Sequence, residues 1–363
     1  MSGATAPGTG ELHALARRTL TVTGVVLATL LLFLLVWQAL EVLLLLFAGL
    51  LLAVLLRAPS TWLSRLTGMP EGWSLVLVLA VLLGASAATA WTVGPDVARE
   101  GQALASGLTE SVGDLEERMR AYPGVSRAID EVQQRYADGI PRMWSRLGGM
   151  GATVLGGIGA LLIVLFVGIF FAFNPRLYLD GLLRLVPLPR RPRACEVLAR
   201  VGHTLRGWLL GQLISMLMLW LSTWLVLHLL GVPLAFILAL LTGLLTFVPY
   251  LGPLLAAIPI GLVSFSVSPS LAAVTLGSYL VIQNIESNVV MPLVLEKTVK
   301  LPPALSVASQ LLMASLVGTL GVLLATPLLA VAQVLVKMLY VEDALGDSME
   351  EPVSQEPVGA PDD

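Results

Sequence analysis

Residues 207–253 read GWLLGQLISMLMLWLSTWLVLHLLGVPLAFILALLTGLLTFVPYLGP and contain no formally charged side chain. The apolar tract continues beyond them, and the single charged residue between Arg206 and Glu296 is Glu286. About 20 residues of apolar helix are enough to cross the hydrocarbon of a bilayer. We therefore expect several membrane helices in this tract. An ionisable group that stands alone in such a tract is a functional-site candidate.

The composition of the whole chain is that of a membrane protein. Of its 363 residues 56% are hydrophobic and 12% are charged, and the mean hydropathy is +0.87, which leaves too little polar material to solvate a globular surface. The sequence predicts an all-α polytopic membrane protein with about eight transmembrane helices, further broken or re-entrant helices, and an extramembrane amphipathic helical hairpin. Its surroundings are then the lipid bilayer, and no feature suggests nucleic-acid binding.

The first part of the chain is predicted to hold three membrane helices. Two apolar stretches, residues 19–36 and 42–56, are expected to form a helical hairpin with its turn at residues 37–41. A third span is expected over residues 73–93, and Gly94-Pro95 ends it. The segments that we expect are a disordered cytoplasmic N-terminus (1–18), transmembrane helices 1–3 (19–95), the extracytoplasmic hairpin (96–147), transmembrane helix 4 (148–173), a basic cytoplasmic segment (174–206), a C-terminal transmembrane bundle with broken helices (207–340) and an acidic disordered tail (341–363).

The segment 96–147 differs from its surroundings because charged residues alternate with apolar ones at helical spacing. Leu104, Leu108 and Val112 recur at intervals of four residues, and Tyr122-Pro123-Gly124 interrupts the pattern. Two amphipathic helices in a hairpin are therefore expected. Their apolar stripe could pack the two helices together, lie on the lipid interface, or pair with neighbouring subunits.

The basic residues predict the orientation in the membrane. Residues 174–206 contain seven arginines against Asp180 and Glu196, and such loops lie on the cytoplasmic side. Counting spans from this loop places the N- and C-termini in the cytoplasm as well.

Two places in the second half interrupt a helix. Pro249, Tyr250, Gly252 and Pro253 follow one another closely, and helix cannot run undisturbed through two prolines four residues apart. The freed carbonyl groups need partners, because hydrocarbon offers none, and transporters use such breaks at substrate and ion sites. A second, weaker interruption is expected at Gly318, Gly321 and Pro327, in a stretch that faintly echoes the residues after Gly252. The echo consists of common residues, which favours coincidence.

Polar residues gather around the solitary acid. On a helix, Gln283, Asn284, Ser287 and Asn288 form one polar face, and Glu286 lies about 60° from its edge. Such a face should point into the protein or into a water-filled path, and it makes these residues candidates for a substrate or ion pathway. The alternative is a helix end at the cytoplasmic surface, with Lys297 or Lys300 as partner of the acid.

Several motifs, taken in order, resemble the AI-2E transporter family of bacterial permease-like proteins. They are Tyr178-x-x-Gly181, Gly207-x-x-x-Gly211-Gln212, Pro249-Tyr250-Leu251-Gly252-Pro253, Gln283-x-x-Glu286-x-Asn288, Leu301-Pro302-Pro303 and Gly318-x-x-Gly321 with Pro327. The resemblance implies a multi-pass protein of the bacterial inner membrane that forms a homo-oligomer and exports the quorum-sensing furanone autoinducer-2. Some members of the family resemble sodium or lithium/proton antiporters.

The sequence predicts a transporter and no enzyme. It contains no nucleophile with a base at plausible spacing, no phosphate loop and no metal motif, so we expect no cofactor and no metal. Our leading hypothesis is export of a small polar solute past the Pro249–Pro253 break and Glu286. The alternatives are Na⁺(Li⁺)/H⁺ antiport and, from another class, a membrane scaffold whose outer hairpin recruits partners.

Overall fold

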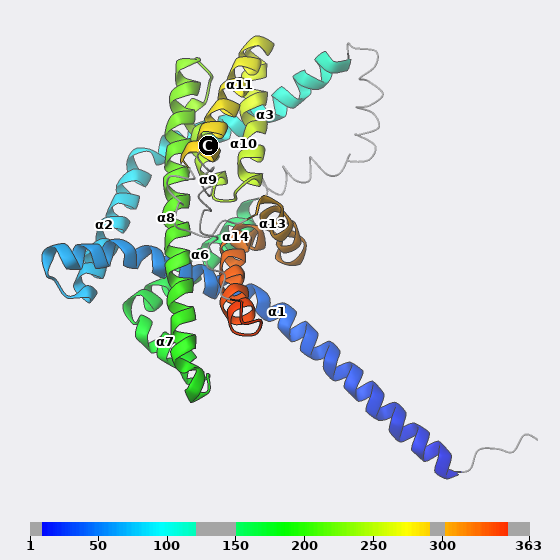
Figure 1. The fold of residues 1–363 in the computed structure, drawn as a ribbon. Helices are drawn as coiled ribbons and strands as arrows, with labels where there is room; N and C mark the ends of the chain where they lie inside the picture. Colours follow the sequence, from blue (N-terminus) through cyan, green and yellow to red (C-terminus); the bar gives the residue numbers. More distant parts are fainter. Residues whose placement is uncertain (1–8, 121–149, 291–301, 348–363) are drawn as a thin grey trace, which may run out of the picture.

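The computed structural model describes residues 9–120, 150–290 and 302–347, and every regular element in these ranges is helical (Figure 1). Four helical stretches are long and apolar enough to cross a membrane, and the bent pair Gly159–Phe173 with Pro175–Arg184 makes a fifth. The class predicted from the sequence, all-α and polytopic, is confirmed. The elements are α1 (Thr9–Thr67), α2 (Glu71–Thr92), α3 (Gly94–Arg120), α6 (Met150–Phe173), α7 (Pro175–Arg184), η1 (Leu188–Arg190), α8 (Arg191–Leu229), α9 (Ala235–Leu245), α10 (Leu251–Val267), α11 (Pro269–Ile285), η2 (Glu286–Val290), α13 (Pro303–Val317), α14 (Thr319–Leu335) and η3 (Val336–Glu342).

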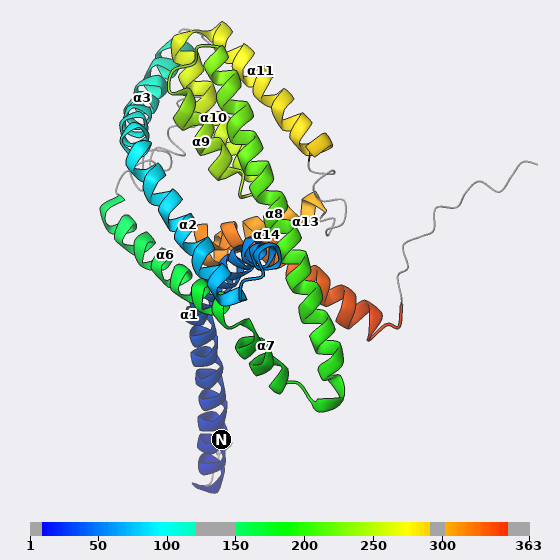
Figure 2. The same cartoon turned by 90° about the vertical axis from the view of Figure 1, so that its left-hand side faces the viewer.

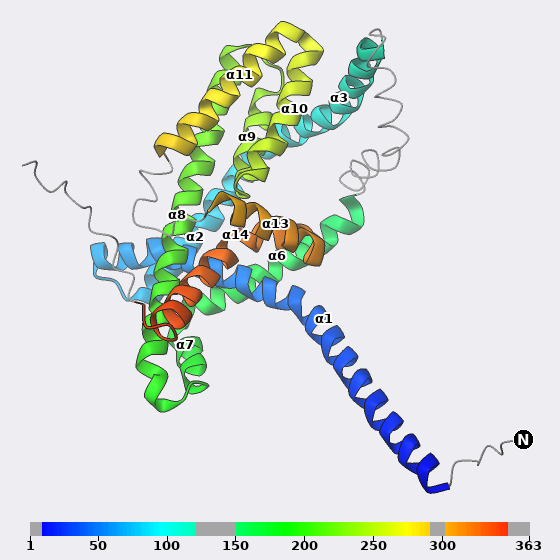
Figure 3. The ribbon, with the colours of Figure 1, turned by 45° about the vertical axis from the view of Figure 1, so that its right-hand side comes forward.

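The predicted hairpin of the first two spans is wrong. Helix α1 continues through residues 37–41 and ends only at Thr67. It changes direction where it enters the body of the protein but does not turn back on itself (Figure 3). The reason is local, because Trp37-Gln38-Ala39-Leu40-Glu41 contains neither glycine nor proline to stop a helix. Only at Gly68, which has a φ of 71°, does the chain turn into α2.

Several helices in the C-terminal part are shorter than a full span. Helix α9 has 11 residues and α10 has 17, so they measure about 16 and about 25 Å against roughly 30 Å of hydrocarbon. Helix α8, with 39 residues, is much longer than a span. The predicted succession of full-length spans after Arg206 is therefore replaced by one long helix and a set of short ones packed on it.

Two bundles share helix α8 (Figures 1 and 2). In the lower bundle, Leu44 and Leu51 of α1, Leu205 and Trp208 of α8 and Leu324 of α14 form one core. In the upper bundle, a second core joins α3, the far end of α8 and helices α9, α10 and α11. Its buried residues are Leu104, Leu108, Leu227, Val232, Leu238, Ala256, Ile260, Val263 and Tyr279.

Helix α3 is the first half of the predicted extramembrane hairpin. Leu104 and Leu108 are buried in the upper bundle, so in this part the apolar stripe packs on the protein's own helices. The Glu100 carboxylate also accepts a hydrogen bond from the backbone N–H of Ile237, 3.1 Å away, in the first turn of α9. The second half of the predicted hairpin lies outside the described residues.

Close helix contacts in the lower bundle depend on two glycines. A Cβ on Gly168 of α6 would lie 3.0 Å from the backbone oxygen of Gly49 of α1, and a Cβ on Gly49 would lie 2.6 Å from a methyl carbon of Val167. Small residues allow such approach in membranes. A Cβ on Gly157 or Gly159, earlier in α6, would meet no other described element within 4 Å, so these two glycines are not needed for the contacts of α6 with the described helices.

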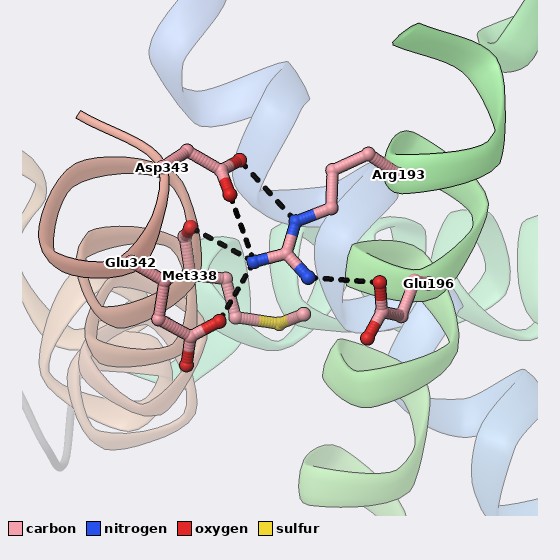
Figure 4. Close-up of polar contacts among 5 residues, drawn as sticks. All are labelled: Arg193, Glu196, Met338, Glu342 and Asp343. Carbon is pink, nitrogen blue, oxygen red and sulfur yellow. Dashed lines mark hydrogen bonds and ion pairs between the residues drawn. The ribbon is translucent and has the colours of Figure 1, made fainter. Parts of the chain in front are cut away.

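The start of α8 is tied to the end of the described chain. The Arg193 guanidinium lies 2.7 Å from a carboxylate oxygen of Glu342, 3.0 Å from one of Asp343 and 2.8 Å from one of Glu196, and it donates to the Met338 carbonyl (Figure 4). The basic segment and the beginning of the acidic tail therefore meet in space.

Candidate functional site

A break separates α9 from α10 where the proline-containing motif predicted one. Helix α9 ends at Leu245 and α10 begins at Leu251. Pro249 and Tyr250 lie in the break, and Tyr250 adopts a φ of 66°, which is unusual for an aromatic residue. Pro253 belongs to the first turn of α10, a position where a helix tolerates proline because that N–H has no helical partner.

Gly252 allows the two helices to meet at this break. A Cβ at this position would lie 1.8 Å from the carbonyl oxygen of Leu245, at the end of α9. No side chain fits there. The glycine of the motif is thus required by the approach of one backbone to another.

Carbonyl groups in the break and in the first turn after it accept hydrogen bonds from side chains of three different helices, so the break is satisfied within the protein, which is one of the two surroundings the sequence predicted for it. The side-chain amide of Gln212 in α8 donates to the Thr246 carbonyl over 2.6 Å, and that of Gln310 in α13 donates to the Pro249 carbonyl over 3.0 Å. The Tyr279 hydroxyl in α11 donates to the Pro253 carbonyl over 2.9 Å. Because carbonyl oxygens only accept, both glutamines must present nitrogen to the break, and their own oxygens point away from it.

Glu286 is buried, with 7% of its surface exposed. It lies at the end of α11, where the helix widens into the π-helical turn η2. One carboxylate oxygen accepts a hydrogen bond from the Ser215 hydroxyl of α8, and the other lies 3.4 Å from the Ser287 hydroxyl. Wide turns of this kind are frequent at functional sites.

Helix α8 brings the acid and the break together. Gln212 and Ser215 are three residues apart, so they lie on the same face about one turn from each other. Gln212 binds the break and Ser215 binds Glu286, and both side chains are at most 2% exposed. They lie midway along α8, at the junction of the two bundles. This junction is the candidate site, and the burial of its side chains means that it is closed in the described conformation.

The second predicted interruption of a helix is found at Gly318, and the other two residues named for it lie within a continuous helix. Gly318, with a φ of 70°, separates α13 from α14, whereas Gly321 and Pro327 lie within α14. A Cβ on Gly321 would lie 2.4 Å from the Met313 carbonyl oxygen of α13. Gly321 thus has the role in the α13–α14 pair that Gly252 has in the α9–α10 pair, and each following helix contains a buried proline. The echo that seemed coincidental in sequence corresponds to a shared structural role.

Gln310 connects the two broken pairs. Besides the Pro249 carbonyl, its amide nitrogen lies 3.2 Å from the Thr326 hydroxyl in α14. Gln310 is fully buried, and Thr326 is 3% exposed. The oxygens of the Gln310 and Gln212 amides are buried and have no hydrogen-bond partner among the described groups. The site therefore presents spare acceptors.

The predicted polar face around Glu286 divides into an inner and an outer part. Gln283 is half-buried, one turn beyond Tyr279. Asn284, Ser287 and Asn288 are exposed, and each donates a hydrogen bond to a backbone carbonyl one turn earlier in its own helix. Lys297 and Lys300, the alternative partners of the acid, lie outside the described residues.

Sequence reasoning assigned four of the residues that build the site no role in it, namely Gln212, which it noted only as part of a family motif, and Ser215, Tyr279 and Gln310. One feature of the sequence could have found them. Each is a single amide or hydroxyl side chain that stands among apolar residues at the three- or four-residue spacing of a helix's buried face. In α8 the buried positions 208, 212, 215, 219 and 223 follow such a spacing.

Within the described residues no cluster of three His, Cys, Asp or Glu could hold a metal, and Cys195 is exposed. Another face of α8 is apolar and exposed, with Ile214, Leu217 and Leu221 on it.

The chain is similar to a family of transporters along most of its length. A family model described as the AI-2E family transporter matches residues 26–340. The candidate transport protein YueF of Bacillus subtilis (strain 168) is 23% identical over 280 residues, which cover 73% of this chain and 76% of that protein. A second candidate transport protein of the same organism, YrrI, is 28% identical over 88 residues, which cover 24% of this chain and 25% of that protein.

Proposed function

The chain belongs to the AI-2E transporter family, and we propose that it exports a small polar solute resembling autoinducer-2 across the bacterial inner membrane. The observation that carries the proposal is the meeting of a buried carboxylate and an interrupted helix on one face of α8, through Ser215 and Gln212. Placing either a carboxylate or an interrupted helix in hydrocarbon costs free energy, so neither feature is explained by insertion into lipid alone. Both are expected where a polar solute passes.

The polar groups of the site suit a solute that donates hydrogen bonds. The Gln212 and Gln310 amide oxygens have no donor among the described groups, and Glu286 adds a carboxylate. No charged residue occurs in α9 or α10 or in α8 beyond Arg206. A hydroxyl-bearing solute would satisfy the acceptors, whereas an anion would meet the repulsion of Glu286 without a cation among the described residues of α8, α9 and α10 near it.

The broken helices supply the parts that have to move. Helices α9 and α10 meet at the Gly252 contact, and α13 and α14 meet at the Gly321 contact, with Gln310 between the two pairs. Discontinuous helices around a central site are typical of transporters that open alternately to the two sides. In this proposal the described conformation is the closed intermediate, and rearrangement of the two pairs opens it.

We also propose a homo-oligomer with cytoplasmic N- and C-termini. The contact of Arg193 with Glu342 and Asp343 supports one common side for the basic segment and the tail. The cytoplasmic position of the N-terminus was inferred by counting two spans in a hairpin over residues 19–56. The structure has a single helix, α1, in place of that hairpin, so this argument no longer supports it. Reaction of cysteines introduced at either end with an impermeant thiol reagent in intact cells would test the orientation.

Na⁺(Li⁺)/H⁺ antiport is the second candidate, and the oxygen-rich site favours it. Carbonyl groups at the end of a broken helix, here Thr246 at the end of α9, are typical ligands of Na⁺ in transporters, and a single buried acid could bind H⁺ in exchange. The scaffold hypothesis has less support, because the stripe of α3 is buried in the protein's own upper bundle as far as Leu108.

The test is transport by the purified full chain in sealed vesicles. Vesicles are loaded with autoinducer-2, and efflux is compared for the wild type, Glu286→Gln and the exposed-site control Asn288→Ala. We expect Glu286→Gln to lower efflux at least tenfold and Asn288→Ala to leave it unchanged. In parallel, an internal pH dye records proton movement after addition of NaCl or LiCl, and a cation-dependent signal without autoinducer-2 efflux would replace export by antiport. Equal efflux from the wild type and Glu286→Gln would remove Glu286 from the mechanism.

A further inference from the structure

Three hydroxyl groups in the upper bundle are buried without a hydrogen-bond partner among the described residues. They belong to Thr223 of α8, Ser264 of α10 and Thr275 of α11, each at most 1% exposed. Most other buried hydroxyls in the described helices are paired, and Ser74 of α2, far from this bundle, is an exception. Of the paired ones, Thr242 donates to the carbonyl four residues earlier over 2.9 Å. We call Thr223, Ser264 and Thr275 the hydroxyl cluster.

The three hydroxyls lie at nearly one level of the bundle. Ser264 precedes Ser268, the turn between α10 and α11, by four residues, and Thr275 follows it by seven, so the two differ by about one turn in height. Helices α8 and α11 run in opposite directions (Figure 1). Measured from the Ser215–Glu286 contact, Thr223 lies about 12 Å along α8 and Thr275 about 16 Å along α11, toward the same end.

The faces that carry the cluster also meet. Leu227, Ile260 and Tyr279 each lie four residues from a member of the cluster and therefore on the same helix faces. All three belong to one core. The hydroxyls thus face the interior shared by α8, α10 and α11, among apolar side chains that cannot pair them.

A line of polar side chains leads from the cluster to the acid. Thr275, Tyr279, Gln283 and Glu286 follow one another at spacings of four, four and three residues, which keeps them within about 80° of arc on one face of α11. Tyr279 and Glu286 are buried and Gln283 is half-buried. In a helix that carries no charged residue before Glu286, this stripe runs inward, from the Ser268 end of the bundle to its middle.

Buried hydroxyls without protein partners are costly, and bound water is the common way in which proteins satisfy them. We propose that the hydroxyl cluster binds water and that, with the stripe on α11, it forms a hydrated path by which Glu286 exchanges protons with the solution at the Ser268 end. Tyr279 is the other titratable side chain on this face. Helices α9 and α10 bear no charged residue, and His228 of α8 is exposed. The inference rests on the proposed role of Glu286 and assigns the side from which that residue is reached.

Accessibility of single cysteines tests the path, because the chain has one native cysteine, Cys195, and it is exposed. In a Cys195→Ser background, Thr223→Cys and Thr275→Cys are compared with Leu219→Cys and Ile260→Cys, whose parent residues are equally buried but apolar. The full-length variants in oriented vesicles are exposed to Ag⁺, a water-soluble ion that reacts with thiols, and the remaining thiols are counted after denaturation. We expect the cluster positions to react at least tenfold faster than the apolar ones, and faster from the Ser268 side. Equal rates at the two kinds of position would overturn the proposal.

A second measurement is needed because a cysteine variant that folds poorly could react fast with Ag⁺ for that reason alone. Thr275→Val replaces the hydroxyl by a methyl group of similar size. In a dry cluster this change removes an unpaired group and raises the melting temperature in detergent, which would contradict the proposal. In a hydrated cluster the melting temperature stays the same or falls. Failure of the exporter proposal is recognised separately, by efflux that does not depend on Glu286.

Discussion

Replacing Gly252 by alanine should open the break between α9 and α10. The added Cβ would lie 1.8 Å from the Leu245 carbonyl oxygen and 2.5 Å from its carbon, whereas ordinary contact begins near 3.4 Å. Both neighbours are backbone atoms, so no side chain can rotate away. Helix α10 must shift by more than an ångström, and with it the Thr246 and Pro249 carbonyls that Gln212 and Gln310 hold.

The expected cost follows from the contact. Forcing atoms into a packed core costs about 1–3 kcal/mol, and the upper end applies here because the obstacle is backbone. The matched control is Gly277→Ala, since a Cβ on exposed Gly277 of α11 meets nothing within 4 Å. An alanine there should gain up to about 1 kcal/mol of helix propensity. We therefore expect unfolding free energies that differ by about 3–4 kcal/mol in SDS titrations of the two purified variants, and at least tenfold slower efflux for Gly252→Ala. If Gly252→Ala is as stable as Gly277→Ala, the close approach of α9 and α10 is not a property of the folded protein.

Three further changes test other contacts. Ser215→Ala removes the hydrogen bond to the Glu286 carboxylate and should lower the unfolding free energy by about 2 kcal/mol in SDS titration. The control is Ser222→Ala, which should change the unfolding free energy little because the Ser222 hydroxyl binds a carbonyl of its own helix. Equal effects of the two changes would refute the pairing of Ser215 with Glu286. Gly168→Leu should separate α6 from α1 and lower the melting temperature in detergent, whereas Gly159→Leu, where an added Cβ meets no other described element within 4 Å, should not. Arg193→Gln should release the end of η3, seen as faster proteolysis near residue 343 in native vesicles; an unchanged digestion pattern would mean that the ion pairs do not hold this segment.

The helix breaks were predictable because their causes are local. Proline lacks an N–H wherever it stands, so Pro249 marked the end of a helix before any contact was known. The same reasoning failed at residues 37–41, where a turn was inferred from a change in apolar character alone. No residue there opposes a helix, and α1 continues through it. Backbone chemistry was a better guide than hydropathy.

The partners of the breaks were not predictable. Gln310 lies 61 residues from Pro249, and only the packing of α13 against the break brings them within hydrogen-bonding distance. Likewise, the helical wheel grouped Gln283 with Asn284, Ser287 and Asn288, but it could not tell which part of that face meets α8. Burial selects Glu286 and leaves the two asparagines outside.

The amino-acid sequence by itself determined that this chain is a helical membrane protein. It also determined where two of its helices end and which acid stands alone among apolar residues. These properties follow from hydropathy and from the backbone chemistry of proline and glycine, which act within a few residues. Tertiary structure alone decided that Gln212 and Ser215 bring the break and the acid to one face of α8, and that Gln310 joins two broken helix pairs. Hydrogen bonds between distant residues depend on how helices pack, and packing is a property of the whole chain.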